Sequence, residues 1–299
     1  MTPPVTPVDT SAVDWSAGGG PGAALRRVLD AATAADGVAP LDEAALLALR
    51  HGPGSSRLWT ADGEGFAWLH GTSLDLVVAP GSRGRGLGAA LATAATTTPG
   101  AMTAWSHGNH PAAAALAAHF GFERVRDLWV MRRPLADLPP LPSRAADRDG
   151  VVVRPFRVGR DEDAFLAVNA EAFASHPEQG SVDRADLDLR MAEPWFDPEG
   201  FLVAERDGQL VGFHWTKVHA AAGGAAAFGE VYVVGVSPSA QGGGLGRRLT
   251  LAGLEHLASR GLDEVILYVE ADNAPAVATY RRVGFTHAEH DTHVQYARR

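Results

Sequence analysis

The sequence predicts an α/β (α+β) protein built from two tandem domains, each with a mixed central sheet flanked by helices. Three observations support this prediction. The chain has 299 residues, of which 46% are hydrophobic and 20% charged, and this is enough apolar material for two buried cores. A proline-rich, polar stretch lies near its middle. Segments typical of strands and helices follow in the same order on both sides of that stretch.

The polar stretch separates the two expected domains. Residues 134–150 have the sequence PLADLPPLPSRAADRDG, which shows no hydrophobic period and is typical of a linker. We therefore expect a first domain over 1–137, a linker over 138–150 and a second domain over 151–299.

The second domain shows the expected order of elements most clearly. Runs of β-branched and aromatic residues predict strands, and amphipathic segments predict helices. In chain order these are a strand at 151–156, a helix at 161–174, strands at 201–205 and 210–218 around an Asp-Gly turn, a strand at 228–236, a helix reaching about Ser259, a strand at 265–270, a short helix from Asn273 and a closing strand at 285–297.

A tandem duplication links the two halves. The segments VVAPGSRGRGLGAAL (77–91) and VGVSPSAQGGGLGRRL (234–249) match without a gap, and Gly86 and Gly244 lie 158 positions apart. In each half, an asparagine, an alanine-containing segment and a Gly-Phe pair follow downstream. The first half is therefore expected to repeat the elements of the second.

Composition excludes several classes of function. The net charge of −9 argues against a nucleic-acid partner or an anionic membrane, and favours small-molecule ligands. The absence of cysteine excludes disulfides, thiolate metal sites and a cysteine nucleophile. The spacing of the histidines establishes no zinc site, so we expect no metal. The sequence shows neither a signal peptide nor a membrane-spanning run, and predicts a soluble, cytoplasmic protein.

The glycine-rich turns are suited to binding an anion. A strand that ends before a proline, followed by Gly-x-Gly and a helix, presents free backbone N–H groups and the positive end of a helix dipole, which suits a pyrophosphate. An ordinary strand-to-helix turn is the alternative. The spacing is not that of a dinucleotide fingerprint, and no Gly-Lys-Ser/Thr follows, which argues against a Walker loop.

The pattern Gln/Arg-x-x-Gly-x-Gly between a strand and a helix resembles the acetyl-CoA motif of the GNAT N-acetyltransferases. In that family the strand contacts the pantetheine arm and the turn holds the pyrophosphate. The resemblance implies acetyl-CoA as co-substrate of both halves. In the first half its expected contacts are Leu76, Val77, Val78, Gly84, Arg85, Gly86, Leu87, Gly88 and Ala89. In the second half they are Val234, Gly235, Val236, Gln241, Gly242, Gly243, Gly244, Leu245, Gly246, Arg247, Asn273, Ala274, Pro275, Ala276, Val277 and Ala278.

Further segments, among them HPEQG (176–180), GFHWTKVH (212–219) and LYVEADNAPAVATYRRVGF (267–285), resemble the mycothiol synthase family, a tandem branch of the GNAT enzymes. The resemblance implies acetyl transfer to the cysteinyl amine of Cys-GlcN-Ins, the last step of mycothiol biosynthesis. It also implies that the second repeat is catalytic and that the first retains acetyl-CoA without turnover.

Two residues of the second repeat have the chemistry that acetyl transfer needs. A protonated amine must lose a proton, and the departing thiolate must gain one. Glu230 precedes the expected CoA contacts and is the candidate base; Tyr280, on the short helix, is the candidate acid. The alternatives are a solvated strand-edge carboxylate and a packing tyrosine. The offset of 158 carries Glu230 onto Thr72, and the first repeat has no tyrosine near Gly121-Phe122. We expect direct attack, with the backbone N–H of Val236 holding the oxyanion.

The same resemblance implies contacts to the acceptor at Glu43, Glu178, Lys217, Glu230 and Tyr268. Lys217 is the only lysine, and it lies in an apolar strand, where it needs a polar partner unless it extends to the surface. Glu43 has a simpler alternative, a helix N-terminal carboxylate. Two other functions stay open: a GNAT enzyme for another amine, such as an aminoglycoside or a protein N-terminus, and a non-catalytic acetyl-CoA-binding protein. We expect a monomer.

Overall fold

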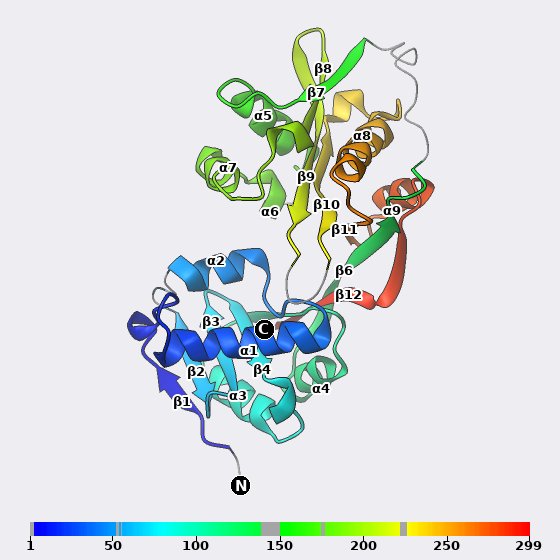
Figure 1. Ribbon diagram of the computed structural model, residues 1–299. Coiled ribbons are helices and arrows are strands. Elements are labelled where there is room, and N and C mark those ends of the chain that lie inside the picture. The colour runs from blue at the N-terminus through cyan, green and yellow to red at the C-terminus, as the bar shows by residue number, and fades with distance from the viewer. Residues whose placement is uncertain (1–2, 52–53, 55, 139–149, 175–176, 222–225) are drawn as a thin grey trace. The chain divides into compact units, whose positions relative to one another are not determined.

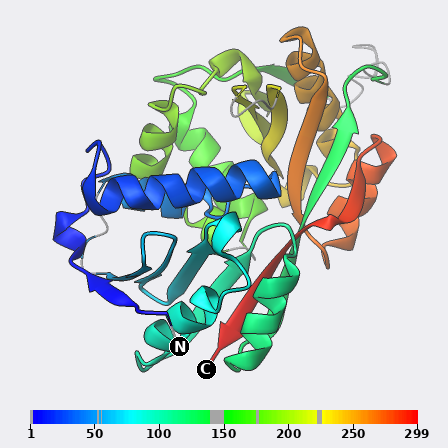
Figure 2. The ribbon, with the colours of Figure 1, turned by 60° about the horizontal axis from the view of Figure 1, so that its bottom comes forward.

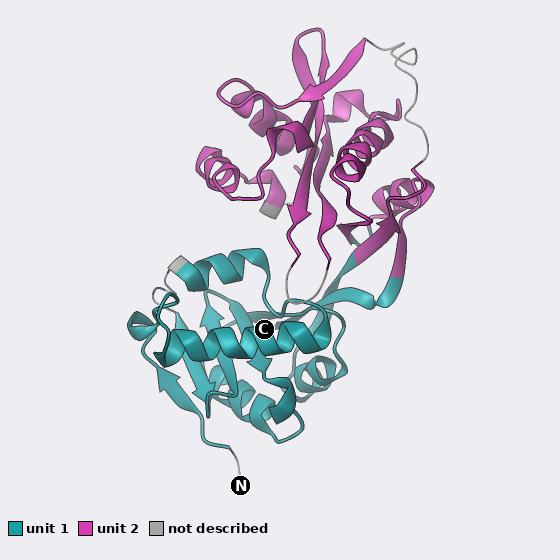
Figure 3. Cartoon of the chain, in the orientation of Figure 1, with its two compact units in different colours: residues 1–129, 270–272, 288–299 teal, residues 130–269, 273–287 magenta. Residues whose placement is uncertain are grey.

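The computed structural model divides into two compact units (Figures 1 and 3). Unit 1 comprises residues 1–129, 270–272 and 288–299, and unit 2 comprises residues 130–269 and 273–287. The structure describes residues 3–51, 54, 56–138, 150–174, 177–221 and 226–299. Most of the expected linker, at 139–149, therefore lies outside the described residues.

Unit 1 is a mixed sheet with helices on both faces. Its strands follow the order β1-β2-β3-β4-β5-β12-β6; β1 to β4 are antiparallel, β4 and β5 are parallel, and β12 is antiparallel to β5. The strands are β1 (Thr6–Val8), β2 (Arg57–Ala61), β3 (Gly65–His70), β4 (Ser73–Val78), β5 (Met102–Ser106), β6 (Glu123–Pro134) and β12 (Thr286–Arg298), and the helices are α1 (Gly20–Asp36), α2 (Glu43–His51), α3 (Leu87–Thr96) and α4 (Pro111–His119).

The core of unit 1 lies on both faces of this sheet. On one face, Leu25, Val28 and Leu29 of α1 pack with Phe66 and Trp68 of β3. On the other face, Leu87, Leu91 and Ala95 of α3 pack with alternate residues of the same strands, such as Ala67 and Leu69. The alternation of side chains along a strand thus gives each helix its own half of the core.

Unit 2 repeats this plan. Its strands follow the order β7-β8-β9-β10-β11-β6, antiparallel from β7 to β10 and parallel between β10 and β11. The strands new to this unit are β7 (Val151–Pro155), β8 (Phe201–Arg206), β9 (Gln209–His219), β10 (Phe228–Val236) and β11 (Glu264–Glu270), and the helices are α5 (Glu162–Ala172), α6 (Pro177–Gly180), α7 (Arg184–Met191), α8 (Leu245–Ser259) and α9 (Ala274–Arg282).

An aromatic cluster fills one face of unit 2. Phe165 of α5 contacts Phe201, Phe213 and Trp215 edge-on, at 4.7 to 6.1 Å between ring centroids. Leu245 and Leu249 of α8 pack on the opposite face with Val151 and Ala204. The sheet of unit 2 therefore has an aromatic cluster on one face and an aliphatic cluster on the other.

The structure confirms the predicted fold class and the predicted strands and helices of 151–297, within a few residues at each end. Helices α6 and α7 are additional to the predicted elements, and a capping box of Asp183 and Asp186 starts α7. The compact units also depart from contiguous halves of the chain. Residues 294–298 of β12 pair with β5 in unit 1 (Figure 2), while 130–134 of β6 belong to unit 2.

Candidate functional site

In each unit, two parallel strands pair at one end and then separate. Strand β10 pairs with β11 at 229–231 and continues to Val236 beside β9. Strand β4 pairs with β5 at Ser73 and continues to Val78 beside β3. The Ser237 N–H donates to the Val211 carbonyl at 2.9 Å, and the Ala79 N–H to the Glu64 carbonyl at 2.7 Å. Because N–H directions alternate along a strand, the N–H groups of Val236 and Val78 point to the diverging side. They are free of the ladder and suited to a ligand.

A glycine-rich turn follows each of these strands. Gly244 (φ 81°) and Gly86 (φ 84°) are the N-caps of α8 and α3, and neither helix has a side-chain cap. The first N–H groups of both helices therefore have no side-chain cap. They lie at the positive end of the helix dipole. The Gln241 Nε2 donates to the Val236 carbonyl at 3.1 Å, and the Arg83 Nε to the Val78 carbonyl at 3.2 Å. The duplicated motif thus makes the same contacts twice.

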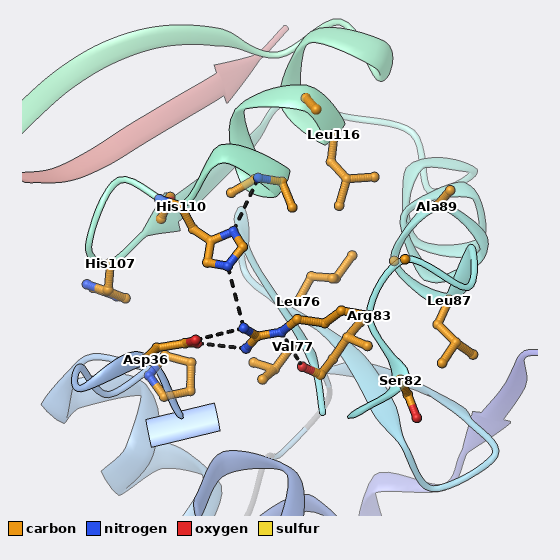
Figure 4. A pocket seen from close by; sticks show the side chains of 18 of the residues that line it. Asp36, Leu76, Val77, Ser82, Arg83, Leu87, Ala89, His107, His110 and Leu116 are labelled. Carbon is orange, nitrogen blue, oxygen red and sulfur yellow. Dashed lines mark hydrogen bonds and ion pairs between the residues drawn. The ribbon is translucent and has the colours of Figure 1, made fainter. Parts of the chain in front are cut away.

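In unit 1 this geometry borders a cavity of about 520 Å³ (Figure 4). Of the contacts expected in the first half, only Arg85 does not line it, and this side chain is exposed. The cavity is lined by Leu76, Val77, Val78, Gly84, Gly86, Leu87, Gly88 and Ala89, together with residues of α1 and α4.

Charged and polar side chains line one side of this cavity. Arg83 makes two hydrogen bonds of 2.7 Å to Asp36, and the arginine lowers the pKa of that carboxyl. His110, the N-cap of α4, approaches Arg83 at 3.5 Å. His107 pairs with His293 at 2.9 Å, and burial lowers the pKa of His107 to about 4. His107 is therefore neutral at pH 7.

In unit 2, the contacts expected for the second half lie in the corresponding places. Val234, Gly235 and Val236 end β10, and Gln241–Arg247 form the turn and first residues of α8. The side chain of Asn273 accepts a hydrogen bond from the Ala276 N–H at 3.2 Å, so it caps α9, whose first residues are Ala274–Ala278.

Glu230 and Lys217 lie opposite each other on β10 and β9. Both are buried, at 6% and 8% exposed. The Lys217 ammonium lies 4.4 Å above the ring of Trp195 and 5.2 Å from that of Tyr232. His219 contacts the Glu230 carboxylate at 2.5 Å. The ladder is irregular between Val231 and Val233, where Tyr232 is the extra residue of a β-bulge. This face of the sheet thus holds a buried carboxylate beside a buried cation.

The remaining expected residues are placed separately. Tyr280 is half-buried on α9, and burial raises the pKa of its phenol to about 12. Tyr268 is exposed on β11, and Glu43 is exposed at the start of α2 in unit 1. Glu178 lies in α6, and its side chain is outside what the structure describes. The structure therefore places Glu230 and Lys217 opposite each other. The roles of all these residues stay predictions, those of Glu230, Lys217 and Tyr280 included.

Comparison with known proteins decides the family. A model of the "Acetyltransferase (GNAT) family" matches residues 167–285. A mycothiol acetyltransferase of a Nocardioides species is 59% identical over 92% of this chain and 97% of its own. A second, from Thermobispora bispora, is 56% identical over 88% and 92% of the two chains. The chain belongs to the mycothiol acetyltransferase family. It is an N-acetyltransferase.

Solved structures agree with this fold. A GCN5-related N-acetyltransferase from Sphaerobacter thermophilus matches 100% of this chain and 96% of its own, with a TM-score of 0.68 and 25% identity. A tandem GNAT protein from the clavulanic acid biosynthesis pathway matches 99% and 98%, with a TM-score of 0.65 and 21% identity. The second likeness supports the tandem fold alone.

The bulge changes how the two repeats of this mycothiol acetyltransferase family member correspond. Before the bulge, the pair Gly212 and Val236 of unit 2 corresponds to the pair Gly65 and Val78 of unit 1. Beyond the bulge, the pair Lys217 and Glu230 corresponds to the pair His70 and Ser73. The counterpart of Glu230 is therefore Ser73. The constant offset of 158 predicts Thr72 instead. Neither is a carboxylate.

The first repeat nevertheless has a buried carboxylate nearby. Asp75 is 8% exposed and contacts His70 at 2.8 Å. Burial raises the pKa of Asp75, although the bond from His70 opposes this effect. Each repeat thus holds a carboxylate–histidine pair on the corresponding pair of strands.

The partners of Glu230 and Lys217 are not among the predicted site residues. They are His219, Trp195 and Tyr232. A usable signal was present for His219, because Lys217 and His219 are two residues apart and so share one face of a strand. The contact of Trp195 comes from the loop before β8, and no local pattern predicts it.

Among the described residues, no cluster of three or more His, Cys, Asp or Glu side chains has a geometry that holds a metal ion. In the same part of the chain, no helix combines the length and the apolar run that a bilayer crossing needs.

Proposed function

We propose that the carboxy-terminal repeat transfers the acetyl group of acetyl-CoA to the cysteinyl amine of Cys-GlcN-Ins, the last step of mycothiol biosynthesis. The printed name of the relatives supports acetyl transfer in this pathway. The observation that carries the catalytic assignment is the buried Glu230 on β10, in the strand whose far end diverges from β11.

Glu230 acts as the base in this proposal. It takes a proton from the ammonium of the acceptor, so that an N–H bond breaks and an O–H bond forms on the carboxylate. The free amine then attacks the thioester carbonyl directly. The N–H of Val236, which points to the diverging side of β10, donates to the resulting oxyanion.

Tyr280 acts as the acid. When the tetrahedral intermediate collapses, the C–S bond breaks and the phenol gives its proton to the departing thiolate of CoA. The second proton of the attacking nitrogen passes to the phenolate, which leaves the neutral amide and restores the phenol. A pKa of about 12 keeps this phenol protonated at neutral pH. The chain holds no cysteine, and the proposed route needs no covalent enzyme intermediate.

Acetyl-CoA binds in both repeats, on the strand ends and glycine-rich turns described above. The first-turn N–H groups of α3 and α8, which have no side-chain cap, support pyrophosphate binding. In the first repeat Ser73 replaces the base and α4 has no tyrosine, so we assign it binding without turnover.

Lys217, Tyr268, Glu178 and Glu43 are proposed contacts of the acceptor. The buried Lys217 ammonium supports this role best, because a buried cation beside a carboxylate can hold polar groups of a sugar. The protein is further proposed to act as a monomer in the cytoplasm, without a nucleic-acid, membrane or metal partner. Light scattering across a concentration series tests the monomer.

The function is tested with purified protein, acetyl-CoA and an acceptor panel of Cys-GlcN-Ins, GlcN-Ins, free cysteine and an aminoglycoside. Products are read by mass, because thiol dyes react with the acceptor itself. The proposal predicts the gain of one acetyl group on Cys-GlcN-Ins alone. Acetylation of another acceptor instead would refute the substrate assignment, and no product with any acceptor would favour an acetyl-CoA-binding protein.

A further inference from the structure

Glu230 has a close partner that the steps above do not use. The Nε2 of His219 lies 2.5 Å from its Oε2. The glutamate side chain is 8% exposed, whereas that of the histidine is 30% exposed. The pair thus joins a buried carboxylate to an imidazole that reaches solvent.

The strands fix this pair in place. His219 lies opposite Phe228, and Glu230 lies opposite Lys217, so the four side chains share one face of the β9–β10 ladder. The imidazole stacks on the Phe228 ring at 4.4 Å between centroids, with an angle of 13° between planes. Stacking and pairing together restrict the orientation of the imidazole.

We infer that His219 is a positioning residue for Glu230. This inference rests on the proposed function. The His219 Nε2–H donates to Oε2 and holds the carboxylate, which leaves Oε1 for the ammonium of the acceptor. The substrate N–H bond breaks as the O–H bond forms at Oε1, and the bond from His219 is kept.

Other titratable groups surround the pair. Lys217 faces Glu230 from β9, Tyr232 lies at the bulge of β10, and Tyr268 lies on β11, two residues beyond the parallel partner of Glu230. From α5, Glu171 binds Ser237 at 2.7 Å instead. A substitution of His219 leaves all of these side chains in the protein, so it tests the imidazole alone.

The test compares two substitutions of His219. His219→Gln keeps an N–H donor at a similar reach, while His219→Leu removes it. For His219→Gln we expect kcat to stay within about threefold of wild type, because the bond to Oε2 is kept. For His219→Leu we expect kcat to fall about 100-fold, because the carboxylate is no longer held. KM for acetyl-CoA is expected to stay unchanged in both.

His290→Gln is the matched control, since the His290 side chain is 83% exposed and its partner is Asp291. A purely structural His219 would lower the melting temperature and leave kcat at the wild-type value in His219→Leu. That result, or an equal loss of kcat in His219→Gln and His219→Leu, would overturn the inference. If the wild type acetylates another acceptor of the panel, the substrate proposal fails and the same rates are measured with that acceptor. Absence of product with every acceptor would overturn both.

Discussion

Tyr280 has an environment that matches its proposed role. Burial raises the pKa of its phenol to about 12, so the proton is present throughout the working range. Tyr280→Phe removes the proton donor and keeps the ring that contacts Phe285. We expect kcat to fall about 100-fold with KM for acetyl-CoA unchanged, measured in steady-state assays. Thr279→Ala, one residue earlier on α9, is the control, and wild-type kcat in Tyr280→Phe would refute its role as acid.

His214 makes the stability of unit 2 depend on pH. Its side chain is fully buried, it binds the Leu249 carbonyl at 2.8 Å through Nδ1, and burial lowers its pKa to about 4 from 6.5. Between these values the unfolded chain binds the extra proton, so the stability from this residue is present above pH 6.5 and is lost as the pH falls toward 4. From pH 7 to 5 the loss is about 2 kcal/mol.

Urea unfolding at several pH values measures this loss. We expect a shallower dependence of the unfolding free energy on pH in His214→Gln, whatever its absolute stability. His290→Gln should keep the wild-type slope. An unchanged slope in His214→Gln would show that His214 does not carry this proton uptake.

At the residue scale, the sequence predicts which positions carry charge in an apolar setting, and less about what they touch. Lys217 stands out as a lysine within an apolar strand, and the structure places it buried beside aromatic rings. The partner of Glu230 depends on the register of β9 against β10, which a sequence pattern does not fix.

The elements of the site depend on the conformation of Gly244. Its φ of 81° is strained for any residue with a Cβ, whereas Gly246 is helical and an added Cβ there would meet Val236 at an ordinary 3.7 Å. Gly244→Ala should therefore lower the unfolding free energy by about 1 kcal/mol. Gly246→Ala should be neutral or slightly stabilising. Thermal unfolding checks both, and equal melting temperatures for the two variants would contradict the strain.

The element scale also shows where sequence prediction ends. Runs of β-branched and aromatic residues locate β8, β9 and β10, and the proline after β10 marks its end. The bulge at Tyr232 leaves no such signal, because the surrounding residues are uniformly β-prone. For the same reason, the pairing of β12 with β5 could not be predicted, since nothing in 286–298 distinguishes one sheet from another.

At the scale of the whole molecule, the proposal of one acetyl-CoA in each repeat predicts two bound molecules. Ala89 lines the cavity of unit 1 in the first turn of α3, so Ala89→Glu places a carboxylate against the phosphates. Calorimetric titration should give a stoichiometry of about two for the wild type and about one for Ala89→Glu. Thr93→Glu, on the exposed side of the same helix, should keep the wild-type value. Equal stoichiometry in all three proteins would refute the first-repeat site.

The most direct measurement compares the two buried carboxylates. Glu230 is paired with His219 in one repeat and Asp75 with His70 in the other. Acetyl transfer to Cys-GlcN-Ins is measured by mass for Glu230→Gln and Asp75→Asn, with melting temperatures to confirm folding. We expect kcat to fall about 100-fold or more in Glu230→Gln and to stay near wild type in Asp75→Asn. Loss of turnover in Asp75→Asn, with turnover kept in Glu230→Gln, would move the chemistry to the amino-terminal repeat.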